Sequence, residues 1–338
     1  MKQKLFSRAT GIKALGVTAA LLMAGMTQLA MAQAYPNKPV KMLIPFPPGG
    51  PTDLTGRTYA DKLTTALGQS FVVENRPGPN GIIVSNATIA AAADGYTLAF
   101  SSVGGAVLAP AINAYRNKPQ DPDTLKQLTA VSLMAETPLG IFVNPSLNIN
   151  TVPELIAQLR ANGAKMNVGS DGIGSSTHLA EELFMNLLKL ESTHVPFKGT
   201  VDVTNALMQN QVQWSVTGIG GPPISLHRQG RVKIIAVGGS TRLPALPELP
   251  TVAEAANLPG FDVASWFAIF VRTGTDKAII NTLSTEIQKA AKMQDVIDKL
   301  GALSIVARGS TPEQLNAKVD ADYKKWSDLL KTGKIKFE

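Results

Sequence analysis

Apolar runs with strand character alternate with amphipathic helical runs along most of this chain, and that alternation limits the folds it can adopt. Most strand runs meet the next helical run through Gly, Ser or Pro. The pattern is typical of α/β layers, in which ligands bind at polar turns beyond the strand ends. Strands are expected at residues 40–44, 71–73, 97–100, 131–135, 140–143, 165–168, 213–216, 232–237 and 266–271. Helices are expected at residues 54–67, 83–92, 152–161, 177–188, 201–208, 275–292 and 312–331.

The N-terminal segment, residues 1–34, has the pattern of a secretory signal peptide. Basic side chains precede an apolar stretch at residues 14–26, which is too short to cross a bilayer comfortably. Ala30-Met31-Ala32 and Ala32-Gln33-Ala34 then offer cleavage sites with small residues. We therefore expect export to the periplasm and cleavage before Tyr35, with an uncleaved membrane anchor as the alternative.

The leader also explains most of the net charge. The formal charge of the 338-residue chain is +7, and removal of the four positive charges of the leader leaves +3 (7 − 4). A small surplus spread along the chain does not favour nucleic-acid binding. The absence of cysteine excludes disulfides, thiolate chemistry and Cys-ligated zinc. The histidines, His178, His194 and His227, lack the spacing of a helical metal-ligand pair, so no metal site is expected.

A turn at residues 45–53, Pro-Phe-Pro-Pro-Gly-Gly-Pro-Thr-Asp, joins the first expected strand to the first expected helix. Backbone N–H groups at a helix N-terminus can bind an anion, and Gly49 and Gly50 can adopt positive φ and let a ligand approach. Pro51 suits the first helical position, and Asp53 suits a stabilising role in the first turn better than ligand contact. The ligand contacts expected here are Phe46, Pro47, Pro48, Gly49 and Gly50.

A second turn of this kind spans residues 169–177 and opens a helix in which Leu179, Leu183 and Leu187 recur every four residues. Its hydroxyl groups could bind a carboxylate oxygen beside a helix N-terminus. Because Ser and Thr commonly serve as plain N-caps, one hydroxyl residue at 175–177 is expected to be only a cap. Two such turns could hold opposite ends of a diacid. The contacts expected here are Ser170, Gly174, Ser175, Ser176, Thr177 and His178.

Three further turns could supply walls for the same site. Ser101 and Ser102 follow an expected strand, and Lys198, Gly199 and Thr200 precede an expected helix. Lys198 could provide a cation or simply be solvated, and Thr200 could be a ligand donor or a helix cap. Thr217 follows the strand expected at 213–216 and completes the set of candidate ligand contacts.

Short motifs occur in a fixed order along the mature chain. They include Tyr35-Pro36, the turn at 45–53, Asp94-Gly95-Tyr96-Thr97-Leu98, His178-Leu179-Ala180 and His194-Val195-Pro196-Phe197-Lys198-Gly199. Each motif is weak alone, but the ordered set resembles the tripartite tricarboxylate transporter substrate-binding proteins, also called Bug receptors. The resemblance covers the whole mature chain.

The resemblance implies an α/β fold of the two-lobed type II periplasmic binding protein class, with a ligand cleft between the lobes. It places lobe 1 at residues 35–134 plus 255–338 and lobe 2 at residues 135–254. It further implies a monomer without cofactor or catalytic activity, which delivers its ligand to the small and large membrane subunits of a permease. Di- and tricarboxylates, aromatic acids and keto acids are all plausible ligands.

The chain departs from this family near the end of one expected strand. Where the family often has Gln-Val-Asp, three apolar residues and a second Asp, this chain has Gln213 and Thr217 in place of the two acids. The cleft is therefore expected to lose negative charge. We hypothesise that this favours a ligand without an ammonium group, or one with more carboxylates, over an amino acid.

Other functional classes are less well supported. The glycines at 169, 172 and 174 have the wrong order for a dinucleotide-binding G-x-G-x-x-G turn. Residues 174–178 end in His instead of the Gly of a hydrolase nucleophile elbow, so a secreted α/β hydrolase is the weaker alternative. A sensor subunit that presents a bound acid to a signalling partner would use the same fold and stays open.

Overall fold

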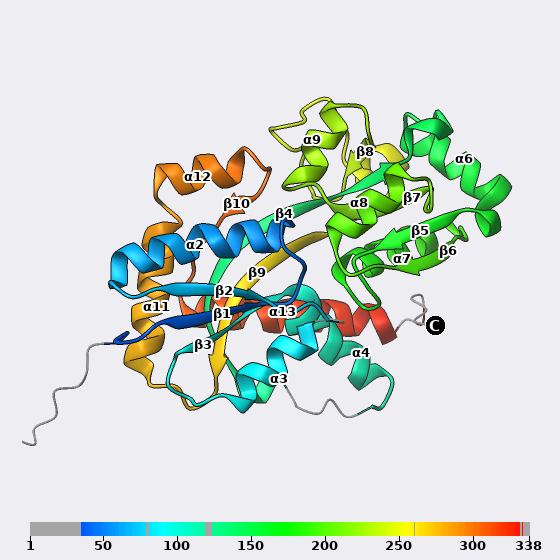
Figure 1. Ribbon diagram of the computed structural model, residues 1–338. Coiled ribbons are helices and arrows are strands. Elements are labelled where there is room, and N and C mark those ends of the chain that lie inside the picture. The colour runs from blue at the N-terminus through cyan, green and yellow to red at the C-terminus, as the bar shows by residue number, and fades with distance from the viewer. Residues whose placement is uncertain (1–34, 79–80, 119–123, 260, 332, 334–338) are drawn as a thin grey trace, which may run out of the picture. The chain divides into compact units, whose positions relative to one another are not determined.

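The computed structural model describes residues 35–78, 81–118, 124–259, 261–331 and 333, and the predicted signal peptide lies outside them. Within this part of the chain, ten strands pair in the order β2-β1-β3-β9-β4-β7-β5-β6, and β8 and β10 each pair with β4 (Figure 1). The strands are β1 (Val40–Ile44), β2 (Phe71–Asn75), β3 (Thr97–Ser102), β4 (Leu128–Val143), β5 (Asn167–Ser170), β6 (Thr193–Pro196), β7 (Trp214–Gly218), β8 (Lys233–Val237), β9 (Ala264–Arg272) and β10 (Val306–Ala307).

The helices connect these strands, and several begin with a side-chain cap. Thr151 accepts a hydrogen bond from Glu154 N at the start of α6, and Thr251 and Glu254 form a reciprocal capping box at α10. The α-helices are α2 (Pro51–Leu67), α3 (Ile82–Ala90), α4 (Ala109–Tyr115), α5 (Thr124–Gln127), α6 (Val152–Asn162), α7 (Ser176–Leu188), α8 (Thr200–Met208), α9 (Pro222–Arg228), α10 (Val252–Ala256), α11 (Lys277–Ala290), α12 (Gln294–Gly301) and α13 (Pro312–Lys331). A π-helical segment, Gly104–Leu108, and the 3₁₀ turns Pro145–Leu147 and Gly163–Lys165 complete the set.

Strand β4 belongs to two sheet regions. Its first part, through Pro138, pairs antiparallel with β9, and its last part, from Leu139, pairs antiparallel with β7 and β8. The sequence predicts two separate strands here, at 131–135 and 140–143. This prediction is wrong because Thr137 and Pro138 interrupt the apolar pattern without interrupting the strand. Figure 1 shows β4 and β9 side by side as the two long strands of the fold.

The pairing partner of β4 changes between Pro138 and Leu139, and β9 begins at Ala264. The lobe boundaries inferred from the resemblance lie near these positions, and they stay a prediction.

Most other expected elements are present. β1 and α13 have the expected bounds, and α2 begins at Pro51, three residues earlier than expected (54 − 51). Several short elements have no counterpart in the sequence prediction: β6, β10, α4, α5, α9, α10 and α12. Among the described strands, β6 pairs only with β5, at a sheet edge, and it carries no continuous apolar run.

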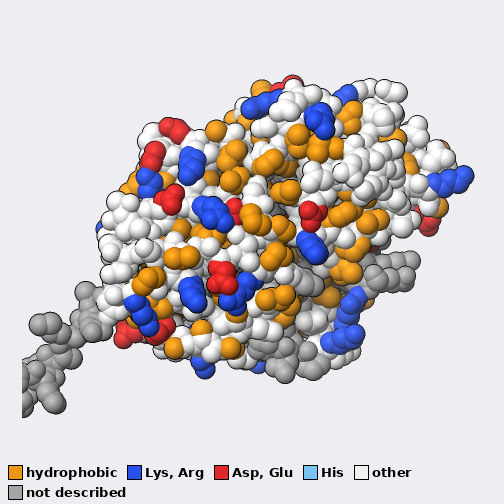
Figure 2. Space-filling model, in the orientation of Figure 1, with side chains coloured by type: hydrophobic (Ala, Val, Ile, Leu, Met, Phe, Trp, Pro, Cys, Tyr) orange, Lys and Arg blue, Asp and Glu red, His pale blue; other side chains and the backbone are white. Residues whose placement is uncertain are grey.

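Both sheet regions are apolar inside. Phe184 of α7 packs against Trp214 of β7 and Phe261, with ring centroids 5.8 and 6.4 Å apart. The face in Figure 2 shows Lys and Arg side chains interspersed with Asp and Glu rather than gathered into one basic patch. Among the helices that the structure describes, none combines the length and the hydrophobicity that a membrane span needs.

Candidate functional site

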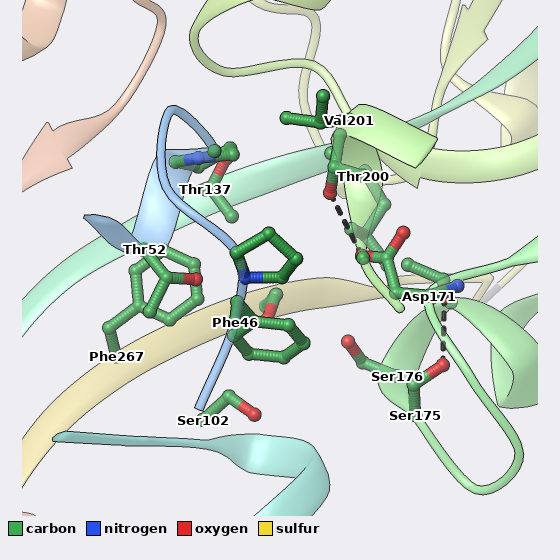
Figure 3. A pocket seen from close by; sticks show the side chains of 18 residues that line it. Phe46, Thr52, Ser102, Thr137, Asp171, Ser175, Ser176, Thr200, Val201 and Phe267 are labelled. Carbon is green, nitrogen blue, oxygen red and sulfur yellow. Dashed lines mark hydrogen bonds between the residues drawn. The ribbon is translucent and has the colours of Figure 1, made fainter. Parts of the chain in front are cut away.

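One pocket lies where four strand ends meet. Phe46 follows β1, Ser102 ends β3, Asp171 follows β5 and Gly218 ends β7. Because β1 runs parallel to β3, and β5 to β7, the topology gathers their carboxyl ends at sheet edges, where α/β proteins bind ligands. The pocket is lined by Phe46, Pro47, Gly50, Pro51, Thr52, Ser102, Thr137, Leu139, Asp171, Ser175, Ser176, Thr177, Gly199, Thr200, Val201, Gly218, Ser265 and Phe267 (Figure 3).

Three helices begin at this pocket. α2 starts at Pro51, α7 at Ser176 and α8 at Thr200, and the first residues of all three helices belong to the lining. The first N–H groups of a helix have no acceptor within the helix, and the helix dipole places about half a positive charge there. The arrangement therefore favours a bound anion.

The loop before α2 holds its shape through one glycine. Gly49 has φ of 87°, in the left-handed region that favours glycine. Gly50, in contrast, is the N-cap with φ of −80° and ψ of 171°, so it does not use the positive φ that glycine permits. Pro51 occupies the first helical position as the sequence predicts, since its missing N–H costs nothing there.

Asp53 supports this loop from behind. Its carboxylate accepts hydrogen bonds from Gly49 N at 3.0 Å, Arg57 Nε at 3.0 Å and Asn75 Nδ2 at 2.9 Å. Asn75 Nδ2 also lies 3.0 Å from the carbonyl oxygen of Phe46, so one network holds both ends of the turn. Burial disfavours the charged carboxylate, but the hydrogen bonds outweigh it and hold the pKa of Asp53 below its usual value. The supporting role predicted for Asp53 is confirmed.

The loop before α7 uses most of its own polar groups internally. Ser175 is the N-cap and accepts from His178 N at 3.2 Å, so the expected cap among the three hydroxyl residues is Ser175. Thr177 Oγ1 accepts from Asp171 N at 2.9 Å and lies 2.8 Å from Ser175 Oγ. Ser176 Oγ forms no hydrogen bond within the described residues, which leaves it available to a ligand.

Asp171 brings a carboxylate into the pocket lining. Its Oδ2 accepts from Thr200 Oγ1 at 2.9 Å (Figure 3). Its Oδ1 accepts from Thr217 Oγ1 at 3.0 Å. Burial raises the pKa of Asp171 to about 6, against the effect of the two threonine hydrogen bonds, and nearby Asp202 raises it further. The pocket thus combines an anion-attracting set of helix ends with a fixed acid.

Five hydroxyl groups of the lining have no hydrogen-bond partner among the described residues. Thr52, Ser102, Ser176 and Ser265 make no side-chain hydrogen bond in the described part of the chain, and the buried Thr137 Oγ1 also lacks a partner there. Hydroxyl groups can both donate to and accept from a ligand. Apolar surface completes the wall, from Phe46, Pro47, Leu139, Val201 and Phe267.

The structure brings part of the expected ligand-contact set together in this pocket. Of the residues named from the sequence, the lining contains Phe46, Pro47, Gly50, Ser102, Ser175, Ser176, Thr177, Gly199 and Thr200. It does not contain Pro48, Gly49, Ser101, Ser170, Gly174, His178, Lys198 and Thr217.

Near β1 and β3, each expected contact that is absent from the lining is exposed, already hydrogen-bonded or on the other face of the sheet. Pro48 is exposed, and the N–H of Gly49 is occupied by Asp53. Ser101 alternates with Ser102 along β3, so its side chain points to the opposite face of the sheet, where it is buried.

Near α7, the expected contacts that are absent from the lining form hydrogen bonds within the protein instead. Ser170 Oγ lies 2.7 Å from His194 Nε2, and Gly174 N donates to His178 Nδ1 at 3.1 Å. The rings of His178 and His194 stack at 4.1 Å and line a separate hollow beside α7. Lys198 is exposed, which is the solvated alternative considered above.

The two positions at which this chain lacks the family's acids lie outside the pocket lining, and the lining itself contains an acid, Asp171. Gln213 lies outside the pocket lining and hydrogen-bonds to the backbone N of Asn167 at 2.8 Å. Thr217 also lies outside the lining and donates to Asp171, which supplies an acid from the loop after β5. The reason given above for preferring a ligand without an ammonium group therefore no longer holds.

Sequence reasoning missed the contribution of β9. Ser265 and Phe267 lie two residues apart on that strand and share the face that lines the pocket. Strand alternation could have paired them, but nothing in the sequence shows that β9 passes this site. Asp171 lies inside a loop that the sequence does single out, between the expected contacts Ser170 and Gly174.

The titratable groups near the site do not form a metal centre. In the described residues, no group of three or more His, Asp or Glu side chains has the geometry to hold a metal ion. Burial lowers the pKa of His178 to about 3 and that of His194 to about 4, so both rings are neutral at ordinary pH. The stacked pair braces the loop after β5 as an uncharged unit.

Comparison with known proteins agrees with this geometry. Protein BugT of Bordetella pertussis is 32% identical over 309 residues, which are 91% of this chain and 93% of BugT. The solved structure of R. palustris Rpa4515 with adipate has a TM-score of 0.83 and 31% identity, and the match covers 89% of this chain and 99% of that one. The structure of MatC from Rhodopseudomonas palustris with bound malate has a TM-score of 0.80 and 29% identity, with 87% and 99% covered.

A family model also matches most of the chain. Residues 55–334 match the model of the tripartite tricarboxylate transporter family receptor. That span contains every described strand except β1, and most of the pocket lining. The α/β fold is that of the periplasmic binding proteins of this type. The chain therefore belongs to the receptor family of the tripartite tricarboxylate transporters, which includes the Bug proteins.

Proposed function

We propose that this protein is a periplasmic receptor that captures a small carboxylate and delivers it, unchanged, to the small and large membrane subunits of a tripartite tricarboxylate-type transporter. The observation that carries the proposal is the convergence of the α2, α7 and α8 N-termini on one pocket. No Lys or Arg of the described residues lines that pocket, so helix N-termini and hydroxyl groups are what a carboxylate would contact. The adipate and malate in the two similar structures support the same ligand class.

Mass spectrometry of ligand released from freshly purified protein, with a thermal-shift panel of acids, tests the proposal. A carboxylate present at a hundred times its dissociation constant stabilises the folded state by about 2.7 kcal/mol. The released ligand should have the same mass as the ligand added back, because capture involves no chemical step. Stabilisation by neutral sugars or cations alone would contradict carboxylate capture.

Ser176→Ala tests the pocket itself. The variant removes a hydroxyl group without a protein partner at the start of α7, so it should weaken binding by about tenfold or more, since hydrogen bonds to charged groups contribute about 1.5–3 kcal/mol. The melting temperature of the free protein should stay unchanged. Ser225→Ala, on the exposed surface of α9, is the matched control and should bind like the parent protein. Equal affinity in the two variants would remove Ser176 from the binding site.

Periplasmic location is tested by fractionation of the producing cells and N-terminal sequencing. The exported form should begin at Tyr35 and behave as a monomer in sizing experiments. A form that retains residues 1–34 in the membrane fraction would instead support the anchor alternative.

A further inference from the structure

We propose that Asp171 selects ligands that carry a protonated amino group beside their carboxylate, so that the receptor captures a small amino-substituted carboxylic acid. This inference rests on the proposed capture of a carboxylate and names the ligand class more closely. It comes from the one charged side chain in the described lining of the pocket.

Asp171 is held in place as a hydrogen-bond acceptor. Each of its carboxylate oxygens accepts one hydroxyl hydrogen, from Thr200 and Thr217 respectively, which leaves further acceptor capacity on both. Its backbone N–H is fixed by Thr177 Oγ1 at 2.9 Å. Figure 3 shows the carboxylate on the side of the pocket toward Thr200, across from Ser102 and Thr52. A donor group on the ligand would therefore meet a pre-positioned acceptor.

The three helix N-termini are not equivalent once Asp171 is considered. Thr200 is the first residue of α8, so the Asp171 carboxylate already occupies the vicinity of that helix end. The N-termini of α2 and α7 stay free to hold a ligand carboxylate, with Thr52 and Ser176 beside them. A ligand that spans the pocket would thus place an anionic group at α2 and α7 and its other group near Asp171.

Charge decides what that other group is. Among the described residues, the acids whose charges act on Asp171 or respond to it are Asp202 of α8 and Glu181 of α7, and neither supplies a positive charge. A second ligand carboxylate near an ionised Asp171 would be repelled, whereas an ammonium group would be attracted and would satisfy the free acceptor positions.

The pH dependence of affinity separates these cases. An ammonium group stabilises the ionised form of Asp171, so affinity should rise as pH rises through about 6, the pKa of this carboxyl in the free protein. A ligand that presents a carboxylate or an acceptor to Asp171 requires the protonated form, so its affinity should fall over the same interval.

Calorimetry on the mature protein with matched pairs of acids tests the proposal. The pairs are aspartate and succinate, glutamate and glutarate, and phenylalanine and 3-phenylpropionate, each measured at pH 5 and pH 7.5. We expect the amino member of at least one pair to bind at least tenfold more tightly than its partner, and more tightly at pH 7.5 than at pH 5.

Asp171→Asn should abolish this preference while the variant still melts cooperatively, because the amide keeps the shape of the carboxyl group. Asp202→Asn removes a nearby charge outside the pocket lining and should retain the preference. A des-amino acid that binds as tightly as its amino partner, or a preference that survives in Asp171→Asn, would overturn the role of Asp171. Binding by no member of any pair would overturn carboxylate capture itself, and this inference with it.

Discussion

Glu181 shows how a single buried carboxyl group can make stability depend on pH. Its Oε1 accepts from Val216 N at 3.0 Å, and its Oε2 has no partner among the described residues. Burial raises its pKa well above the usual value, so the folded state favours the protonated form.

Glu181→Gln is expected to remove that pH dependence. In the parent protein the contribution of Glu181 is fully present below its unfolded pKa and is lost as pH rises toward the raised folded pKa. Gln keeps an acceptor for Val216 and cannot ionise. Urea unfolding from pH 4 to pH 8 should therefore show a flatter stability profile for the variant. An unchanged slope would mean that Glu181 does not titrate in this range.

Asp53 has the opposite behaviour, because its pKa is lowered in the folded state. Asp53→Asn should lower the free energy of unfolding by about 1–3 kcal/mol at pH 7, since a buried acceptor of three hydrogen bonds is replaced by a group with its own donors. The loss should shrink as pH falls below the unfolded pKa of Asp53. Asp328→Asn, in an exposed ion pair on α13, should leave stability nearly unchanged and is the control. Equal losses in both variants would contradict the supporting network.

These residues also show which residue roles can be predicted from the sequence alone. Position in a first helical turn indicates the role of Asp53, because that inference needs only local sequence. The partners of Asp171 and Glu181 come from α8 and β7, which are distant in the sequence. No local pattern shows that Thr217 faces Asp171.

At the scale of elements, β4 depends on a glycine that the Ile219 side chain and strand β8 both crowd. A Cβ atom at Gly140 would lie 2.8 Å from Ile219 Cδ1 and 3.0 Å from the carbonyl oxygen of Ala236 in β8. Gly140→Ala should therefore lower the free energy of unfolding by about 1–3 kcal/mol through overpacking. Gly301→Ala, in α12 with no atom near the added Cβ, should be neutral or slightly stabilising. Urea unfolding of both variants checks the contrast, and a neutral Gly140→Ala would contradict the crowding.

The elements that sequence patterns locate well are long and clearly periodic, such as α13, or apolar and flanked by turns, such as β1. Patterns fail at β4, where a proline inside a continuous strand has the local signature of a loop. They also fail at β6, whose place depends on pairing with β5 rather than on its own residues.

For the whole molecule, the ordered motifs indicate the family correctly because they span the entire mature chain. The pocket as a unit is less accessible to sequence reasoning. Its lining comes from segments between Phe46 and Phe267, and strand pairing between distant parts of the chain, including that of β4 with β9 and β7, brings these segments together.

The continuity of β4 has a consequence for the cooperativity of unfolding. Trp214 lies in β7 and Trp266 in β9, and both strands pair with β4. If either sheet region unfolded, β4 would lose half of its pairing partners, and the other region also depends on β4. The two sheet regions should therefore unfold together as one cooperative unit. In a Trp326→Phe background, which removes the third tryptophan, the fluorescence of the Trp214→Phe and Trp266→Phe variants should give coincident denaturation midpoints. If one substitution shifts the midpoint, circular dichroism of the same variant should show the same shift. Two separate denaturation midpoints within one variant would instead mean that each sheet region can stay folded after the other has unfolded.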